Sequence, residues 1–566
     1  EEDISIFKGE ENKAVLPSKF IYVNPYQNKE NGFSNSGFKL DNCRFIQHRL
    51  IAFSYPTGED AAFDALLDKY NNPDAENSRY CEGDWFDDMR IRKAQYTSYV
   101  GAYDTPVAIS SAENIEITNC YFEGAQGITT RGCKYVNISN NTMIGKAVMY
   151  GNSGSEFMHT TYTDNIDISN NKIYGKDLYT DPNGDLEEGD LTLCRSIIIQ
   201  LPSGSSTNSY FADNDINRIG DNASNSGEHI MYECLGLHFM DKPASVTGEG
   251  GVTLSFDNTQ FENRQQTFST GTYDNWYVKT YTRNGSGASA TDTESSRYIG
   301  KTFAVVIDGK GESQYRRIVG FTESSITVER PWDIVPDQTS TIVIMNAVEN
   351  SVNYRNTIIG SKKYYLDGNA SAGSQPYATM LDYIVAENDF RHMYTGVFCD
   401  LHFNNKRLTS PKEGRGTHYA DIQTEGFNWL EDALIYDNVI TDTRKGIDIQ
   451  ICYSADNDIT DGSDPLTVTH GVVIRNNTLK DMRYGFEYDS AGVNVIEGIG
   501  AEGVFVGSLD KDYTIWNYNP LWQGDWIRDT LIENNKITNA AKASIGLYYH
   551  QANTMLRNNY CGGITD

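Results

Sequence analysis

Carboxylate residues recur at matched positions in three short segments of the C-terminal half. Each segment begins with a glycine nine residues after an Asn, Asp or Glu, and the segments are residues 396–402, 446–451 and 485–490. In an extended strand alternate side chains point to opposite sides, so the carboxylates are expected to share one exposed face. A carboxyl pair can divide acid and base chemistry, because one group protonates a leaving oxygen while the other activates water. The predicted catalytic residues are Asp400, Asp448, Glu487 and Asp489.

The spacing of stacked strands predicts which carboxylates could cooperate. Neighbouring strands lie about 4.8 Å apart and alternate residues about 6.6 Å apart, so Asp400 and Asp448 are expected about 8 Å apart at the backbone. A short repeat starting at Asp456 is expected between the strands of Asp448 and Glu487, which gives about 9 to 10 Å. Both values lie near the window of about 6.5 to 9.5 Å for inverting glycosidases, and a retaining pair at about 5 Å fits less well.

Polar and aromatic side chains extend this predicted face toward both ends of the chain. Aromatic rings stack on sugars while planar polar groups bind hydroxyls, so the set is typical of a carbohydrate site. For a single Asp, Glu or His on so acidic a chain, the alternative is a solvated or structural role. The predicted substrate-binding residues are Arg131, Gln200, His229, Glu233, His402, Gln450 and Tyr548.

A calcium loop is a weaker candidate. Asp181, Asn183 and Asp185 have the early oxygen spacing of such a loop, but the glycine at its sixth position and the terminal glutamate are missing. Calcium is therefore possible as a structural ion, and no cofactor is required by the predicted chemistry.

One short motif predicts the elements that position these residues. It alternates apolar and variable residues, reaches an Asn or Asp that is usually followed by Asn, and recurs at about 20 residues where its copies lie closest. Period-2 alternation at this spacing predicts the coils of a β-solenoid, each stacked on the next. Asn tolerates the left-handed conformation of a turn, and its side-chain amide can hydrogen-bond from coil to coil. The clearest copies are residues 115–122, 136–143, 166–173, 472–479, 530–537 and 554–561.

The motif resembles the rung pattern of right-handed parallel β-helix proteins, the pectate-lyase-like superfamily, over residues 37–263 and 355–563. A β-sandwich with Asn-rich turns is the structural alternative, but it has no reason to keep one motif at one spacing. The resemblance implies an all-β, right-handed parallel β-helix. By analogy it also implies a polysaccharide-degrading enzyme in an extracellular, periplasmic or cell-surface location.

The resemblance leaves the reaction open. A glycoside hydrolase acting on a polysaccharide or oligosaccharide is the leading expectation. A polysaccharide lyase is the alternative enzyme; such lyases use calcium and a basic residue beside a uronate, and here the predicted face holds no Lys and only Arg131. A non-catalytic glycan-binding adhesin, or a tailspike-like solenoid, is the alternative outside enzymes.

The pattern divides the chain into three parts. Residues 1–263 are expected to form the N-terminal part of the β-helix, with a loop or helical insertion at about 55–110. Residues 264–352 lack the Asn motif and contain hairpin-like runs, which predict a small inserted β domain. Residues 353–566 are expected to complete the β-helix, with long loops at 401–431 and 490–528.

Composition excludes several classes of protein. The 566 residues carry a net charge of −30, which disfavours nucleic acid as a partner, and 12% aromatic residues disfavour a disordered chain. No apolar run is long enough for a transmembrane helix. The chain starts at Glu1 without a leader, which fits a mature exported protein. The nine cysteines include no CxxC pair, so neither a zinc site nor a disulfide framework is predicted. The acidity favours a neutral or weakly charged glycan.

Overall fold

The structure is a computed structural model of the chain. It describes residues 21–23, 35–46, 106–110, 112–124, 127–145, 156–161, 163–175, 196–201, 205–217, 228–234, 237–257, 271–275, 279–284, 291–295, 302–321, 324–360, 372–403, 429–453, 469–488, 494–500, 502–508, 527–548 and 551–563. Residues 55–105 of the predicted insertion and the repeat at Asp456 lie outside these residues, whereas residues 107–110 form a strand of the solenoid. The calcium-loop candidates Asp181, Asn183 and Asp185, and the catalytic candidate Asp489, also lie outside the described residues.

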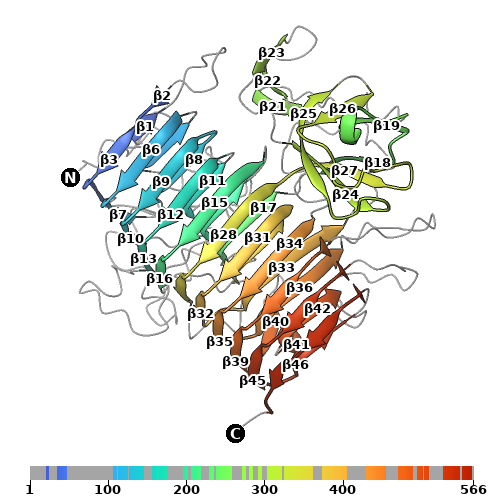
Figure 1. Cartoon of the computed structure of the whole chain (residues 1–566). Coiled ribbons are helices and arrows are strands. Elements are labelled where there is room, and N and C mark those ends of the chain that lie inside the picture. The colour runs from blue at the N-terminus through green and yellow to red at the C-terminus, as the bar shows by residue number, and fades with distance from the viewer. Residues whose placement is uncertain are drawn as a thin grey trace.

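Three all-parallel sheets, in which strands of successive coils pair with one another, form the main body (Figure 1). The first, sheet A, contains in spatial order β1 (Ile21–Val23), β5 (Val107–Ser110), β8 (Ile128–Arg131), β11 (Glu156–Thr161), β14 (Ser196–Leu201), β17 (Glu228–Cys234), β30 (Ala372–Ala378), β33 (Thr395–Phe403), β36 (Lys445–Tyr453), β42 (Glu502–Ser508) and β46 (Ala543–Leu547).

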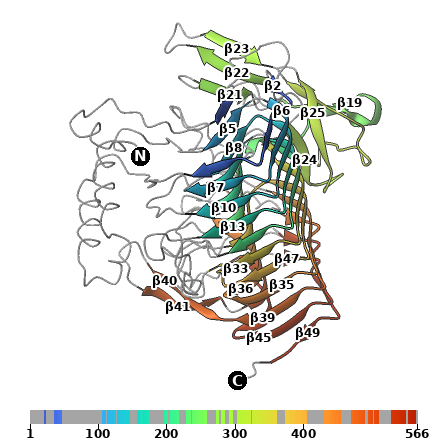
Figure 2. The same ribbon diagram turned by 90° about the vertical axis from the view of Figure 1, so that its left-hand side faces the viewer.

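Sheets B and C complete each coil, and Figure 2 shows the coils stacked one on another. Sheet B contains β2 (Asn35–Ser36), β3 (Lys39–Asp41), β6 (Ala112–Thr118), β9 (Lys134–Ser139), β12 (Asp164–Ser169), β15 (Ser206–Ala212), β28 (Val348–Tyr354), β31 (Met380–Ala386), β34 (Leu430–Tyr436), β37 (Thr469–His470), β38 (Val473–Arg475), β43 (Ile527–Arg528), β44 (Leu531–Glu533), β47 (Gln551–Ala552) and β48 (Met555–Arg557). Sheet C contains β4 (Arg44–Ile46), β7 (Tyr121–Gly124), β10 (Thr142–Gly145), β13 (Lys172–Gly175), β16 (Asp215–Asn217), β29 (Thr357–Ile359), β32 (Asp389–Arg391), β35 (Val439–Thr443), β39 (Thr478–Met482), β45 (Lys536–Ala540) and β49 (Tyr560–Cys561). The predicted parallel β-helix is therefore confirmed.

The Asn motif forms the corner between sheets B and C, and its two central residues have different roles. The first adopts the left-handed conformation, with φ of 54° at Asp437 and 57° at Asn476. The second is buried: Asn438 donates from Nδ2 to Asn477 Oδ1 at 2.9 Å and to the Val385 carbonyl at 2.9 Å. This amide ladder continues from coil to coil and confirms the predicted hydrogen bonding. Its members are Asn141, Asn171, Asn214, Asn356, Asn388, Asn438, Asn477, Asn535 and Asn559.

A second column of left-handed residues lies five residues before each of these corners, within sheet B. Its members with φ between 51° and 60° are Asn114, Tyr135, Asn165, Asn208, Asn350, Asp382, Asp432, Asp529 and Asn553, of which Asn165 has the smallest φ. Gly471 occupies the same position in its coil with φ of 72°, and a Cβ there would lie 2.6 Å from Asp432 Oδ1. Most strands of sheet B continue through this position, as β28 and β31 do, whereas Gly471, Asp529 and Asn553 separate β37 from β38, β43 from β44 and β47 from β48.

An antiparallel sheet interrupts the solenoid between β17 and β28. Its spatial order is β18 (Leu237–Asp241), β27 (Thr341–Asn346), β24 (Thr302–Asp308), β25 (Tyr315–Phe321), β26 (Ser325–Val328), β20 (Thr253–Ser255) and β19 (Ser245–Thr247), with the 3-10 helix η3 (Glu249–Gly251) between its last two members in the sequence. A three-stranded antiparallel sheet contains β21 (Gly271–Asn275), β22 (Lys279–Asn284) and β23 (Thr291–Ser295). The inserted β domain thus includes strands upstream of residue 264, and β28 already belongs to the solenoid.

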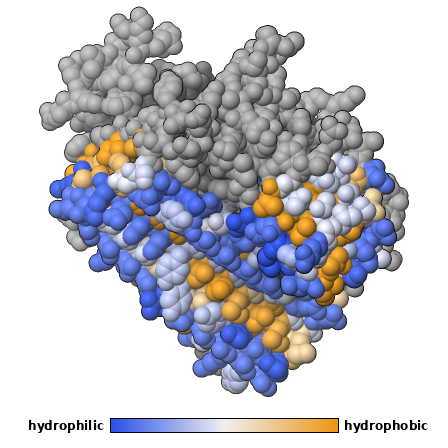
Figure 3. Space-filling model, turned by 45° about the horizontal axis from the view of Figure 1, so that its top comes forward, coloured by the Kyte–Doolittle hydropathy of each residue, from blue (hydrophilic) through white to orange (hydrophobic). Residues whose placement is uncertain are grey.

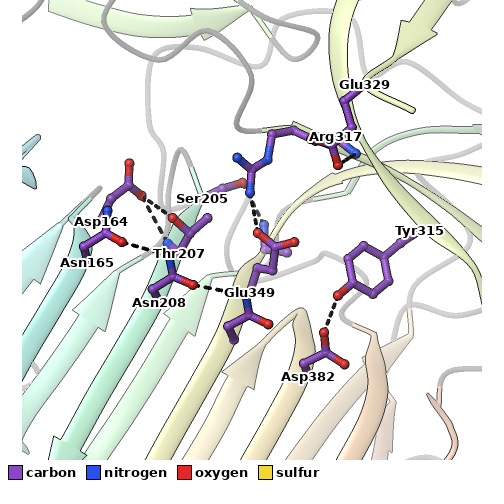
Figure 4. A network of polar contacts seen from close by, with 12 residues as sticks. Asp164, Asn165, Ser205, Thr207, Asn208, Tyr315, Arg317, Glu329, Glu349 and Asp382 are labelled. Atoms are coloured by element: carbon purple, nitrogen blue, oxygen red, sulfur yellow. Dashed lines mark hydrogen bonds and ion pairs between the residues drawn. The ribbon is translucent and has the colours of Figure 1, made fainter. Parts of the chain in front are cut away.

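The insertion rests on sheet B rather than on sheet A (Figure 4). Arg317 of β25 pairs with Glu349 of β28, and the Tyr315 hydroxyl donates to the carboxylate of Asp382 in β31. Tyr315 and several apolar residues of β24 and β27 also join the core of the solenoid. The outer face of sheet A, where the catalytic candidates were predicted, is therefore not the surface on which these inserted strands dock.

Candidate functional site

The outer face of sheet A carries two predicted catalytic residues in neighbouring strands. Asp448 of β36 pairs with Phe398 of β33, and Asp400 of β33 pairs with Gln450 of β36. The alternating residues of both strands, such as Ile447 and Ile449, lie in the hydrophobic core. The predicted register of these two segments is confirmed, and Asp400 and Asp448 are diagonal neighbours.

The predicted register of the third segment is wrong. The strand next to β36 is β42, in which Phe505 pairs with Asp448. Strand β40 (Tyr484–Tyr488) instead forms an antiparallel hairpin with β41 (Asn494–Gly500), so Glu487 pairs with Ile496. The local hairpin satisfies the backbone of this segment, and the chain re-enters sheet A only at residue 502. A sequence signal was present, because Gly503-Val-Phe repeats Gly396-Val-Phe.

The loop predicted at 490–528 is accordingly wrong in its first part, since β41 and β42 lie within it. The loop predicted at 401–431 starts inside β33 and ends inside β34, and residues 404–428 lie outside the described part of the chain. The first correction matters for the site, because β42 contributes the nearest neighbours of Asp448 and Lys445.

A buried lysine, Lys445, binds Asp448. The Nζ of Lys445 donates to Asp448 Oδ2 at 2.7 Å and to Gln450 Oε1 at 3.3 Å. The same Nζ lies 4.1 Å from the centroid of the Phe505 ring. Asp448 is 0% exposed and Lys445 2% exposed. The sequence prediction that no Lys lies on this face is therefore wrong.

Lys445 reaches the outer face because the alternation of side chains is broken at Gly446. Strict alternation would put Lys445 on the same side as Ile447, which is in the core. A Cβ on Gly446 would meet the Gly503 carbonyl at 2.4 Å and Leu479 of the core at 3.2 Å. Gly446 thus occupies the inward position beside Ile447, and the alternation is broken at this point.

A second buried carboxylate, Glu502 of β42, lies next to Lys445 across the strands. Its Oε1 accepts from Lys542 Nζ at 2.8 Å and from the Tyr548 hydroxyl at 3.0 Å. The Tyr548 ring stacks on Phe505 with centroids 4.6 Å apart. The predicted binding residue Tyr548 therefore belongs to this cluster, whereas sequence reasoning missed Lys445, Glu502 and Lys542.

The electrostatics of the cluster favour a protonatable carboxyl. Burial raises the pKa of Asp448 to about 6; Lys445 opposes this shift, and Glu502 and Asp400 add to it. Burial disfavours the charge of Lys445, but the neighbouring Asp448, Tyr394 and Glu502 outweigh it and raise the pKa of Lys445. Among the described residues, no hydrogen-bond partner reaches Asp448 Oδ1 or Glu502 Oε2. Two buried carboxylate oxygens are thus left for a ligand or a proton.

Three further predicted binding residues belong to strands of sheet A that lie at different distances from β33. His402 pairs with Cys452 and alternates with Asp400 along β33. Glu233 pairs with Tyr377 of β30, the strand next to β33. Arg131 pairs with Thr161 of β11, and its strand β8 lies five strand spacings from β33, which corresponds to about 24 Å. Arg131 is therefore too far away to act at Asp448.

The backbone register of Gln200 differs from the predicted one. It aligns Gln200 with Thr160 and Tyr232, which are buried on the inner side. A one-residue error in the start of β14 is enough to exchange inner and outer faces. The sequence left the register of His229 open; His229 is fully buried, and its Nδ1 lies 3.0 Å from the Ala372 carbonyl.

Neither a metal cluster nor a membrane-spanning helix is found in the described residues. No group of three or more His, Cys, Asp or Glu side chains there could hold a metal ion. Helices in the same residues are too short and too polar to cross a membrane.

Comparison with known proteins assigns no function to this architecture. No protein-family model matches the chain, and no curated protein matches it.

Proposed function

We propose that the protein is a glycoside hydrolase that acts on a neutral or weakly charged glycan, with Asp448 as general acid and Asp400 as general base. The observation that carries the proposal is the buried Asp448 carboxyl, with an unpartnered Oδ1 one strand away from Asp400. The step from a parallel β-helix to a glycan substrate is an analogy of fold, because a fold alone does not define a reaction.

The environment of Asp448 suits proton donation. A pKa of about 6 leaves a substantial protonated fraction in weakly acidic solution, as a general acid requires. Because Oδ2 accepts from Lys445, the proton would be held on Oδ1. Asp448 is fully buried, so glycan binding must displace the groups that cover Oδ1.

Asp400 has a different environment, which suits the base. Its side chain is partly exposed and lies on the strand next to Asp448, in the diagonal position. That arrangement separates the two backbones by about 8 Å, within the range that leaves room for a water molecule in inverting glycosidases. The pair would therefore invert the anomeric configuration.

The residues around the pair suit a neutral sugar. The Tyr548 ring, which stacks on the buried Phe505, is partly exposed and could pack on a sugar face, and Gln450 offers a planar amide. The two lysines are paired with carboxylates, Lys445 with Asp448 and Lys542 with Glu502. No surplus of positive charge is left in this cluster for a polyanionic glycan.

The first prediction concerns activity. On a panel of neutral and uronate-containing polysaccharides, the wild-type chain should release reducing ends from a neutral member. Asp448→Asn and Asp400→Asn should each lower kcat about 10²- to 10⁴-fold, the usual contribution of general acid–base catalysis. Asp389→Asn is the matched control, because Asp389 pairs with Arg391 on sheet C. Full activity of both site variants would exclude this pair.

A polysaccharide lyase is the second candidate, since the structure brings Lys445 and Lys542 onto the predicted face. A paired lysine could neutralise a uronate carboxylate, although the raised pKa of Lys445 argues against its action as a base. The two reactions are separated by their products. Elimination creates an unsaturated uronate that absorbs in the near ultraviolet, and hydrolysis does not. Glycan binding without either product would favour the non-catalytic alternative.

A further inference from the structure

We infer that Lys445 is a positioning residue that sets which oxygen of Asp448 carries the proton and how readily that proton is released. The catalytic meaning of this inference rests on the proposed function. The contact between Lys445 and Asp448, and its effect on the protonation of Asp448, are independent of that function.

All directions of the Lys445 ammonium are occupied. It donates to Asp448 Oδ2 at 2.7 Å and to Gln450 Oε1 at 3.3 Å, and it lies 4.1 Å from the centroid of the Phe505 ring. A lysine that is 2% exposed loses the conformational freedom of its stem and the hydration of its charge. Its position is therefore fixed by these contacts.

This contact makes the two oxygens of Asp448 different. Oδ2 accepts a charge-assisted hydrogen bond, so protonation there would break it. Oδ1 has no hydrogen-bond partner among the described residues. A proton on Asp448 therefore sits on Oδ1, the atom that would face the leaving oxygen of a substrate.

Lys445 also opposes the other groups that face Asp448. Within β36 the near polar group is Gln450, from β33 the charged neighbour is Asp400, and from β42 it is Glu502. Tyr394 faces Lys445, and the Arg444 guanidinium lies 4.1 Å from the centroid of the Tyr394 ring. Lys542 and Tyr548 bind Glu502. Among the described residues, only Lys445 hydrogen-bonds to the side chain of Asp448, so its removal leaves burial and two carboxylates to favour the protonated acid.

The test is a pH titration of the Asp448 carboxyl by ¹³C NMR on the full chain, with the signal assigned by its absence in Asp448→Asn. Lys445→Met keeps the length of the side chain and removes its charge. We expect it to raise the midpoint by about 1 to 3 pH units, the usual effect of a close opposite charge. Lys542→Met is the matched control, because Lys542 pairs with Glu502, and it should move the midpoint by less than about 0.5 units.

Lys445→Arg keeps the charge and should restore most of the wild-type midpoint, and Lys445→Gln is the neutral variant to titrate if Lys445→Met does not fold. An unchanged midpoint in Lys445→Met, or an equal shift in Lys542→Met, would overturn the inference. If a glycan is cleaved, the alkaline limb of kcat should move in the same direction as the NMR midpoint. A shifted midpoint in a chain that cleaves no glycan would support the role of Lys445 and reject the proposed function.

Discussion

At the scale of single residues, the Asn-type pairs show how side-chain chemistry determines the shape of a coil. The first residue of each pair adopts a left-handed conformation that Asn and Asp tolerate better than most residues. The second residue binds both to the next coil and to the previous one. Asn438, for example, donates to Asn477 and to Val385, while its Oδ1 accepts from Asn388.

The two positions of one pair should respond differently to substitution. Asn438→Ala leaves buried partners in two other coils unsatisfied and should lower the free energy of unfolding by about 3 kcal/mol or more. Asp437→Gly keeps the left-handed conformation, so it should change the free energy of unfolding by no more than about 1 kcal/mol. Denaturant unfolding monitored by circular dichroism measures both. Equal losses in the two variants would contradict the role of the buried amide.

At the scale of elements, the inserted domain is joined to the solenoid by a charged contact at one end of its β24–β25 hairpin. Glu431 of β34 is fully buried and accepts from Ser313 at 2.6 Å and from the Trp429 indole at 2.8 Å. His470 of β37 lies between Glu431 at 3.4 Å and Asp529 at 2.8 Å. In the same column, Arg528 of β43 binds Glu312 of the hairpin at 2.7 Å.

This contact should make stability depend on pH. Hydrogen bonding to Glu431 raises the pKa of His470; burial opposes the shift, and Glu431, Asp529 and Glu312 add to it. A raised folded-state pKa contributes stability below the unfolded value of about 6.5, and this contribution is lost as pH rises through the folded value. The wild type should therefore have a higher free energy of unfolding than His470→Gln, and this difference should be larger at about pH 5.5 than at about pH 8.5.

Asp529→Asn is the control for that experiment. It removes one of the carboxylates that favour protonated His470, so the pH dependence of the wild type should become weaker. Urea unfolding at a series of pH values measures all three proteins. A difference between wild type and His470→Gln that grows toward alkaline pH would show that His470 is not protonated in this contact.

At the scale of the whole molecule, the solenoid is a stack in which each coil contacts its neighbours. One hydrophobic core runs through the coils, and a second core lies within the inserted sheet. The face shown in Figure 3 is largely hydrophilic where it is coloured, and it carries several apolar patches. Apolar residues of the last described coils are more exposed, including Met555 at 58% and Tyr560 at 61%.

Local stability should follow position in the stack. Strands β31 and β34 pair on both sides, whereas β48 and β49 each pair with one described strand. Amide hydrogens of β48 and β49 should therefore exchange about 100-fold faster than those of β31 and β34, because fewer neighbours must separate for them to open. Hydrogen exchange read by mass spectrometry tests this, with the well-packed β24 and β27 of the insertion as an internal reference. Uniform exchange along the solenoid would contradict a stack of locally coupled coils.

The sequence by itself determined the class of fold, because a left-handed corner residue and a stacked Asn amide are local requirements that recur in most of the described coils. It also determined the pairing of Asp400 with Gln450 and of Phe398 with Asp448, where glycine and apolar alternation are regular. The sequence did not predict which strand pairs with the other edge of β36 and so contributes the remaining neighbours of Asp448. The β40–β41 hairpin separates consecutive strands of sheet A in the sequence, and only the folded chain brings β42 onto β36.

The tertiary structure alone decided the composition of the candidate site. Lys445 faces outward because the alternation of side chains is broken at Gly446, whose Cβ position is directed at Gly503 and Leu479 of other coils. Glu502 becomes its neighbour through pairing across a gap of more than forty residues. Periodicity assigns a side chain to a face only while alternation holds, and burial of a charge depends on every element packed around it. The repeat therefore follows from local chemistry, whereas the buried Lys445–Asp448 pair follows from long-range packing.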